Sequence, residues 1–328
     1  MQSFKSFDQV LYTANDSTFE DIALHLFYKQ ANENKVYRDF IGFLGIDPSS
    51  IHKLENIPFL PISFFKSHLI ATGDFKPEIV FSSSGTTGLT TSRHGIRQLS
   101  FYLENAKRNF ELFFGSLRNY HILALLPSYL EREGSSLIYM VDYFIKETQS
   151  DYSGFFLNDY QALLKRIKEL KTGSRKVILL GVSFALLELA EKFEADLSHC
   201  LIMETGGMKG RRKEITREEL HEFISAKFNV KLICSEYGMT ELMSQAYSLG
   251  NGLYKSPPWM KMMVRDINDP FKFEPWGKTG GINVIDLANQ HSCAFIETQD
   301  LGKVDQNGSF EVLGRFDNSD IRGCNLLA

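Results

Sequence analysis

The sequence predicts an α/β protein with a mostly parallel central sheet flanked by helices and a smaller antiparallel β region toward the C-terminus. From about residue 78, short apolar runs alternate with longer amphipathic runs, which is typical of strands and helices that build a parallel sheet. After residue 250, glycine, proline and tryptophan become frequent and three short strand-like runs follow. The length of 328 residues is ample for a large buried core.

The expected elements follow one another along the chain. A helix begins after Ser17 and Thr18, with apolar residues at helical spacing, and a second helix over residues 36–44 ends at Gly45. Residues 59–65 form an apolar connector that follows Pro58 and contains Pro61. Further strands are expected at 79–81, 122–126, 177–180, 201–203, 232–234, 281–286, 294–298 and 310–313, and further helices at 98–114, 135–145, 159–170, 185–193 and 217–226.

The composition argues against several classes of protein. The 36 basic and 40 acidic side chains give a formal charge of −4, so no basic excess indicates nucleic-acid binding. Residues 1–15 lack the basic and apolar regions of a secretory signal, and the most apolar run, 177–187, is too short to span a membrane. The 4 cysteines are scattered without a CxxC pair, which disfavours a disulfide framework or zinc site. We expect a cytoplasmic protein.

A segment rich in serine, threonine and glycine, residues 81–88, follows an apolar strand and precedes a predicted helix. Its backbone amides and hydroxyls are suited to cradle an anion, although a polar surface loop has the same composition. No lysine follows a glycine at the spacing of the P-loop, so the P-loop mechanism is excluded.

Four further segments carry polar groups. Gly206 and Gly207 follow a predicted strand, where glycine lets a flat ligand approach the backbone, but Glu204 stands where a dinucleotide fingerprint has its first glycine. Residues 235–241 read Ser-Glu-Tyr-Gly-Met-Thr-Glu. Their aromatic ring could stack on a base, their hydroxyl could hold a phosphate and their carboxylate could bind Mg²⁺. Alternatively, Tyr237 is a packed aromatic and Glu241 is a carboxylate at the start of a helix. Residues 298–302 and 314–323 contain Asp300 and Arg315, and either segment is also typical of a turn.

In this order, the segments resemble the adenylate-forming superfamily of acyl-CoA synthetases and luciferases over residues 80–323. The Thr-Gly-Gly-Met-Lys-Gly stretch and the ending Arg-Gly-Cys-Asn-Leu-Leu resemble one branch, the LuxE-type acyl-protein synthetases, and the phenylacetate-CoA ligases are the nearest cousins. The resemblance implies a large-domain adenylate-forming fold. Its core would span residues 1–314 with an N-terminal helical segment at 1–75, followed by a tail at 315–328, without the mobile C-terminal domain of larger relatives.

The resemblance also implies that ATP and Mg²⁺ bind. Thr240 would contact the α-phosphate and Glu241 would bind Mg²⁺. Asp300 would hold the ribose hydroxyls, with Arg315 close to the ribose and phosphate. The residues implied to wrap the phosphates are Ser83, Ser84, Gly85, Thr86, Thr87 and Gly88, and those implied to enclose adenine are Gly206, Gly207 and Tyr237.

Cys324 is the acyl acceptor that the resemblance implies. It lies four residues from the end of the sequence, and the neighbouring Arg322 can lower the pKa of its thiol. The implied reaction activates a carboxylic acid, in this branch a fatty acid, as acyl-AMP and transfers the acyl group to this cysteine. An acyl reductase or another acyl-acceptor protein is the implied partner. The other cysteines, which lie in apolar strand patterns and are expected to be buried and inert, are Cys200, Cys234 and Cys293.

The chain departs from the family in places. Relatives carry Pro-Lys after the phosphate loop, where this chain has residues 89–93, Leu-Thr-Thr-Ser-Arg, and Ser235 stands where many have asparagine. From the resemblance, we expect that the domain carrying the adenylation lysine in larger relatives is absent. Two other hypotheses stay open: a phenylacetate-type acyl-CoA ligase, and a non-catalytic nucleotide-binding subunit of a biosynthetic complex. The aromatic residues that either line an acyl tunnel or belong to the core are Phe64, Phe65, Tyr129 and Trp259.

Overall fold

The computed structural model describes residues 7–83, 91–126, 134–206 and 215–316, which fall into two compact units. The discontinuous unit combines the chain up to Phe75 with the chain from Pro258 onward, and the continuous unit runs from Lys76 to Pro257. The boundary between a core of 1–314 and a tail of 315–328 stays a prediction, because residues 317–328 lie outside the described part.

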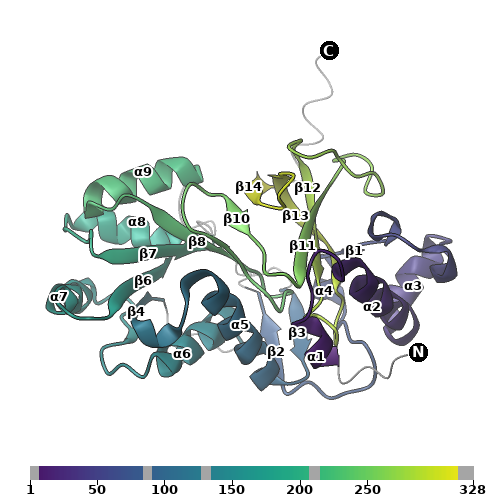
Figure 1. The fold of residues 1–328 in the computed structure, drawn as a ribbon, viewed down its shortest axis with the longest axis horizontal. Helices are drawn as coiled ribbons and strands as arrows, with labels where there is room; N and C mark the ends of the chain where they lie inside the picture. The colour runs from purple at the N-terminus through teal and green to yellow at the C-terminus, as the bar shows by residue number, and fades with distance from the viewer. Residues whose placement is uncertain (1–6, 84–90, 127–133, 207–214, 317–328) are drawn as a thin grey trace, which may run out of the picture. The chain divides into compact units, whose positions relative to one another are not determined.

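The continuous unit contains the parallel sheet (Figure 1). Its strands are β4 (Tyr120–Leu125), β5 (Gly154–Phe155), β6 (Lys176–Val182), β7 (Cys200–Thr205), β8 (Ile233–Tyr237), β9 (Ala246–Ser248) and β10 (Tyr254–Lys255). The order is β5-β4-β6-β7-β8, all parallel, and β9 and β10 continue it antiparallel. Strands β4, β6 and β8 are buried along almost their whole length, and β4 and β6 are correspondingly rich in apolar residues.

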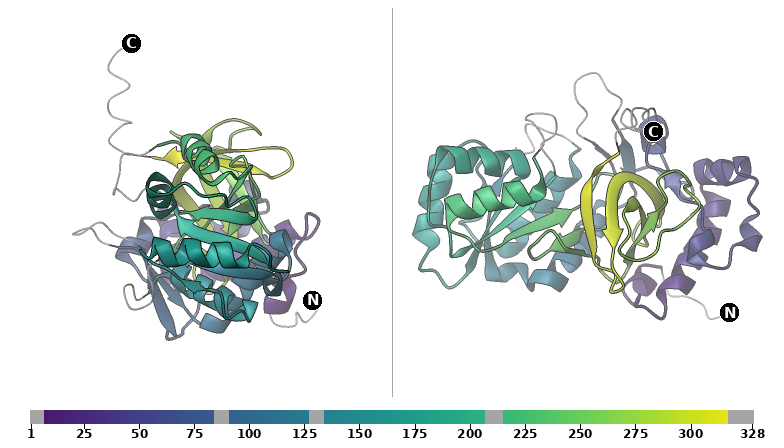
Figure 2. Two further views of the ribbon diagram at one scale, coloured as in Figure 1. Left: turned by 90° about the vertical axis from the view of Figure 1, so that its left-hand side faces the viewer. Right: turned by 90° about the horizontal axis from the view of Figure 1, so that it is seen from above.

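Helices cover both faces of this sheet. They are α5 (Leu99–Phe114), α6 (Ser136–Thr148), α7 (Tyr160–Leu170), α8 (Ser183–Lys192) and α9 (Arg217–Phe228), with a short 3₁₀ helix, η3 (Leu117–Asn119). Helices α8 and α9 lie side by side on one face, and α5 and α6 lie on the other (Figures 1 and 2). Helix α9 begins with a capping box, in which Thr216 and Glu219 each accept the other's backbone N–H.

A separate hairpin contains β2 (Ile79–Ser82) and β3 (Arg93–Ile96), paired antiparallel. The predicted anion segment, residues 81–88, therefore lies between two strands, and an unpredicted strand, β3, precedes the predicted helix that begins at Leu99. Strand β3, Arg-His-Gly-Ile, lacks the apolar alternation of a strand, yet three of its four residues are buried. Tertiary burial outweighs its weak local preference.

The discontinuous unit is built on an antiparallel sheet, β11-β12-β13-β14, with β1 added parallel to β13. Its strands are β1 (Leu60–Pro61), β11 (Met260–Arg265), β12 (Gly280–Asp286), β13 (Phe295–Val304) and β14 (Phe310–Arg315). Its helices are α1 (Phe7–Leu11), α2 (Phe19–Glu33), α3 (Lys35–Phe43), α4 (Phe64–Ser67), η1 (Pro48–Ser50) and η2 (Leu54–Asn56).

The N-terminal helices are fastened to this sheet by apolar and polar contacts. Phe27 of α2 and Tyr37 of α3 both pack on Phe295, with ring centroids 6.0 and 6.2 Å away. The buried Gln30 side chain donates to the carbonyl of Asn289 at 3.0 Å and accepts from the amide of Ala294 at 2.9 Å. Residues 7–75 and the C-terminal strands thus share one core. Phe65 and Trp259 are buried in this unit, Phe64 is half-buried, and Tyr129 lies outside the described residues.

Candidate functional site

Polar side chains gather at the carboxyl ends of β7 and β8. The two strands are parallel and in register, so Glu204 lies beside Ser235 and Thr205 beside Glu236. Gly206 follows β7 with a φ of +72°, in the left-handed region that favours glycine. Ligands of open parallel sheets bind at this edge, so the predicted glycine and tyrosine segments meet where a ligand is expected.

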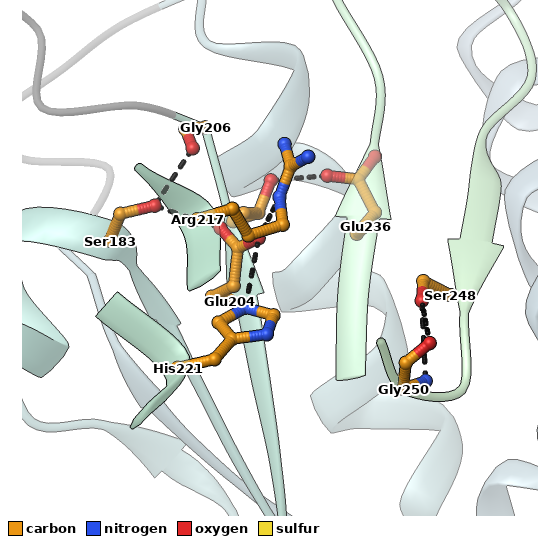
Figure 3. A network of polar contacts seen from close by, with 9 residues as sticks. Ser183, Glu204, Gly206, Arg217, His221, Glu236, Ser248 and Gly250 are labelled. Carbon is orange, nitrogen blue, oxygen red and sulfur yellow. Dashed lines mark hydrogen bonds and ion pairs between the residues drawn. The ribbon is translucent and has the colours of Figure 1, made fainter. Parts of the chain in front are cut away.

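Glu204 is the centre of a buried polar cluster (Figure 3). Its side chain is only 3% exposed although it lies in an apolar strand. Ser183, at the start of α8, places its hydroxyl 2.8 Å from both Glu204 Oε2 and the carbonyl oxygen of Gly206. Arg217, at the start of α9, places Nε 3.3 Å from Glu204 Oε1, and His221 Nε2 lies 3.7 Å from the same oxygen. The cluster joins two helix starts to the end of β7.

The carboxylate of Glu204 is held in its charged form. Burial acts to raise its pKa, but His221, the charge of Arg217 and the hydrogen bond from Ser183 together lower the pKa below its usual value. The serine hydroxyl contacts the carboxylate and not the imidazole, so this is no arrangement for activating a nucleophile. The same hydroxyl contacts the Gly206 carbonyl, so it links the carboxylate to the backbone at the end of β7. Sequence reasoning noted Glu204 only as a departure from a glycine motif; a carboxylate inside an apolar run was itself the signal of buried partners.

Replacing Glu204 by Gln is expected to lower the free energy of unfolding at pH 7 by about 3 kcal/mol, because it removes the buried negative charge that faces the Arg217 guanidinium. The pKa of Glu204 is lowered in the folded protein, so its stabilisation is present above its unfolded pKa of about 4.3 and is lost as the pH falls through its folded pKa. Urea unfolding at pH 7 and in steps below pH 4 would measure this.

The matched control is Glu222→Gln, which removes the same charge from an exposed position on α9. Its unfolding free energy should stay within about 0.5 kcal/mol of the wild type. If the difference between the wild type and Glu204→Gln does not shrink as the pH falls, Glu204 is not the charged centre of the cluster.

The Tyr237 segment is packed by its neighbours. Tyr237 is buried, with its ring 6.0 Å from that of Tyr254. Glu236 accepts a hydrogen bond from the Thr205 hydroxyl, and its Oε1 lies so close to Gly238 that a β-carbon there would meet it at 2.3 Å. Only glycine fits at position 238 without moving this carboxylate.

Thr240 and Glu241 are fixed by contacts from two other elements. His94 Nδ1, on β3, lies 2.8 Å from the carbonyl oxygen of Thr240, and since a carbonyl only accepts, Nδ1 carries the hydrogen. The buried Asn105 of α5 donates to the carbonyl of Met243 at 2.9 Å. Glu241 is 5% exposed. The motif is thus held against both the β2–β3 hairpin and α5, and sequence reasoning missed His94 and Asn105.

At the base of the hairpin, Ser83 is tied to Ser92. The Ser83 amide donates to the Ser92 carbonyl at 3.1 Å, and the Ser92 amide donates to the Ser83 hydroxyl at 2.9 Å. The predicted site residues that lie outside the described part of the chain are Ser84, Gly85, Thr86, Thr87, Gly88, Gly207 and Cys324.

Asp300 and Arg315 form a pair in the discontinuous unit. They are direct register partners on β13 and β14, with Arg315 Nε 3.2 Å from Asp300 Oδ1. The Asp300 side chain is 8% exposed and that of Arg315 is 75% exposed. Residues 298–302 belong to the continuous strand β13, so their reading as a turn is wrong. Arg315 ends β14.

Within the described ranges, no group of three or more histidine, cysteine, aspartate or glutamate side chains is arranged to hold a metal ion. Mg²⁺ usually takes one or two carboxylates from a protein and completes its shell with phosphate oxygens and water. Glu241 has the carboxylate oxygens that such a role needs. No helix among the described residues has the length and apolar character needed to cross a membrane.

No family model and no curated protein matches the chain. Among solved structures, an open conformation of 2-hydroxyisobutyryl-CoA ligase in complex with 2-HIB-AMP and CoA matches with a TM-score of 0.65 at 12% identity, over 92% of this chain and 70% of the ligase. The chain has the fold of an adenylate-forming ligase.

Two nucleotide-bound structures share this adenylate-forming fold over part of their length. ATP-bound MatB from Rhodopseudomonas palustris matches with a TM-score of 0.54 at 18% identity. The O-succinylbenzoate coenzyme A synthetase MenE from Bacillus subtilis, in complex with AMP, matches with a TM-score of 0.51 at 19% identity. Each match covers 74% of this chain and 49% of the other, so the chain spans about half the length of these enzymes. The fold class predicted from the sequence is confirmed.

Proposed function

We propose that this chain activates a carboxylic acid as acyl-AMP with ATP and Mg²⁺ and then transfers the acyl group to Cys324. The contact between His94 and Thr240 carries this proposal. It joins two segments 146 residues apart: the hairpin whose loop has the composition of a phosphate cradle, and the Thr-Glu pair whose hydroxyl and carboxylate suit phosphate and Mg²⁺. A phosphate loop and a metal ligand need this closeness to act on one nucleotide.

The proposed roles are those that the resemblance to adenylate-forming enzymes implies. Thr240 contacts the α-phosphate, Glu241 holds Mg²⁺, and Tyr237 packs against adenine. Asp300 binds the ribose hydroxyls, and the exposed guanidinium of Arg315 lies near the ribose and phosphate. The other proposed nucleotide ligands are Ser83, Ser84, Gly85, Thr86, Thr87, Gly88, Gly206 and Gly207. When bound, Mg²⁺ supplies charge neutralisation to the phosphates.

The chemistry explains why a nucleotide is needed. A free carboxylate has no leaving group other than oxide, so a thiol does not displace it. In the first step, a carboxylate oxygen bonds to the α-phosphorus and pyrophosphate leaves with the electrons of the broken P–O bond. In the second, the cysteine thiolate bonds to the carbonyl carbon and AMP leaves, giving a thioester.

The described cysteines are poor acyl acceptors. Burial raises the pKa of Cys200 and Cys293 to about 12 and that of Cys234 to about 11. All three thiols are therefore protonated at neutral pH, and Cys234 and Cys293 are also buried from a substrate. Of the 4 cysteines, this leaves Cys324 as the acceptor that we propose.

A second candidate is an acyl-CoA ligase, because the 2-hydroxyisobutyryl-CoA ligase structure that matches over 92% of this chain holds CoA. Both candidates form acyl-AMP and differ in the thiol that receives the acyl group. A non-catalytic nucleotide-binding subunit would form none.

Exchange of labelled pyrophosphate into ATP tests the proposal. We expect exchange only when ATP, Mg²⁺ and a carboxylic acid are all present, with fatty acids of increasing chain length as the first acids to try. An acyl group should then appear on the protein without CoA. Thioester formation on CoA alone would favour the second candidate, and absence of exchange across the acids would favour the non-catalytic subunit.

Replacing Asp300 by Ala is expected to weaken ATP binding roughly 10- to 100-fold, the worth of a hydrogen-bonding carboxylate. The loss follows from the proposed bonds between this carboxylate and the ribose hydroxyls. Isothermal titration calorimetry with ATP and Mg²⁺ would measure the affinity.

Lys303→Ala provides the matched control, because Lys303 and Glu311 form another ion pair between β13 and β14, at 3.0 Å. This variant should bind ATP like the wild type. If Asp300→Ala lowers the unfolding temperature but not the ATP affinity, Asp300 serves only its pair with Arg315.

A further inference from the structure

Arg265, at the end of β11, is a buried arginine in the discontinuous unit, with 6% of its surface exposed. Its guanidinium donates to the carbonyl of Ile282 at 3.0 Å, to Asn283 Oδ1 at 2.8 Å and to the carbonyl of Thr298 at 2.8 Å. It also lies 3.4 Å from a carboxylate oxygen of Glu297. A buried cation is costly unless it is paired and hydrogen-bonded, and these contacts meet that condition.

The sheet is built to admit this side chain. A β-carbon at Gly281 would lie 2.5 Å from the Cζ atom of Arg265, so any larger residue there would displace the guanidinium. The pairing of β12 with β13 also shifts register between Gly281 and Asn283, next to the Arg265 contacts. A glycine and a bulge together mark a position where a strand has made room for a side chain.

The contacts of Arg265 lead to Asp300 through Thr298. The Thr298 hydroxyl accepts a hydrogen bond from the Asp300 amide at 3.1 Å and donates to the carbonyl of Ile282 at 2.7 Å. Arg265 holds the carbonyls of both Thr298 and Ile282. One guanidinium thus binds the carbonyl of Thr298, whose hydroxyl holds the Asp300 amide, and the carbonyl of Ile282 that this hydroxyl also contacts.

We propose that Arg265 is a positioning residue that holds the Asp300 carboxylate in place to select nucleotides with ribose hydroxyls. The inference rests on the proposed function, which assigns ribose binding to Asp300. Arg265 acts through Thr298 and need not touch the nucleotide. Lysine at this position would keep the charge but lose the planar fork that reaches both carbonyls.

The experiment compares the affinities for ATP and 2′,3′-dideoxy-ATP by calorimetry, with the ratio of the two dissociation constants as readout. The wild type should prefer ATP by roughly tenfold or more. Asp300→Ala should bring the ratio close to unity. Arg265→Lys and Gly281→Ala should each lower it by roughly threefold or more, since small misplacement weakens directional bonds. Lys303→Ala should leave it unchanged.

A ratio of affinities separates positioning from general destabilisation, because a partly unfolded protein loses affinity for both nucleotides equally. Arg265→Lys and Gly281→Ala disturb the guanidinium in different ways, so either variant, if it folds, is sufficient to test the proposal. If Asp300→Ala loses the preference while Arg265→Lys and Gly281→Ala retain it, Arg265 is a structural residue only. If the wild type binds ATP without a preference, or Asp300→Ala retains it, the ribose assignment of Asp300 fails instead.

Discussion

Replacing Glu241 by Gln is expected to reduce acid-dependent pyrophosphate exchange by roughly 100-fold or more, the usual effect of removing one group that stabilises transition-state charge. Glutamine keeps the size of this nearly buried side chain and removes its charge. Mg²⁺ should then bind more weakly, so the Mg²⁺ concentration for half-maximal exchange should rise as the maximal rate falls.

The exposed Glu222→Gln again serves as the control and should exchange like the wild type. Thermal unfolding followed by circular dichroism would show whether Glu241→Gln is folded. If the folded variant exchanges at the wild-type rate under limiting Mg²⁺, Glu241 is not a ligand of the metal. If the variant is less stable but exchanges normally, Glu241 has a structural role only.

Replacing Cys324 by Ser is expected to abolish stable labelling of the protein by the acyl group while leaving acyl-AMP formation intact. The thioester would form only at this thiol, and the exchange reaction precedes it. Intact-protein mass spectrometry after incubation with ATP and the active fatty acid should show one added acyl group on the wild type and none on the variant. Hydroxylamine should release the group, because it cleaves thioesters.

Serine variants of Cys200, Cys234 and Cys293 are the matched controls, and each should keep the label. Peptide mass spectrometry locates the modified residue. An acyl group found on any of these three positions would contradict the assignment, and efficient transfer to CoA with an unlabelled protein would favour the ligase alternative.

Much of the fold was predictable because its strong elements carry local signals. Helix α9 has its capping box at Thr216 and Glu219, and β4 and β6 have unbroken apolar runs. The strand predicted at residues 294–298 continues to Val304, and the sequence left the Asp300-Leu301-Gly302 stretch open because glycine also marks turns. Here a β-carbon at Gly302 would lie 2.2 Å from the carbonyl oxygen of Glu311, so the glycine permits close strand contact. A single sequence does not distinguish these two uses.

The candidate site was predictable only in part. The residue types and their order were enough to predict the chemistry of Tyr237, Thr240, Glu241 and Asp300. The residues that hold this motif in place could not be predicted, because each comes from a distant part of the chain. His94 lies 146 residues from Thr240, and Asn105 lies 138 residues from Met243. A carboxylate in an apolar strand, such as Glu204, indicates that it has buried hydrogen-bond or charge partners, but only the fold shows which residues they are.

The turn between β13 and β14 has a consequence for the tolerance of this chain to insertions. Asp305 closes the turn by accepting from the amides of Asn307 and Ser309, and Gly308 takes a φ of +76°. Surface turns commonly accept added residues. Here one added residue that slipped the register would move Arg315 to the opposite face of the sheet from Asp300, since successive side chains alternate. Homologues that keep this pair should therefore vary the sequence of the turn more readily than its length.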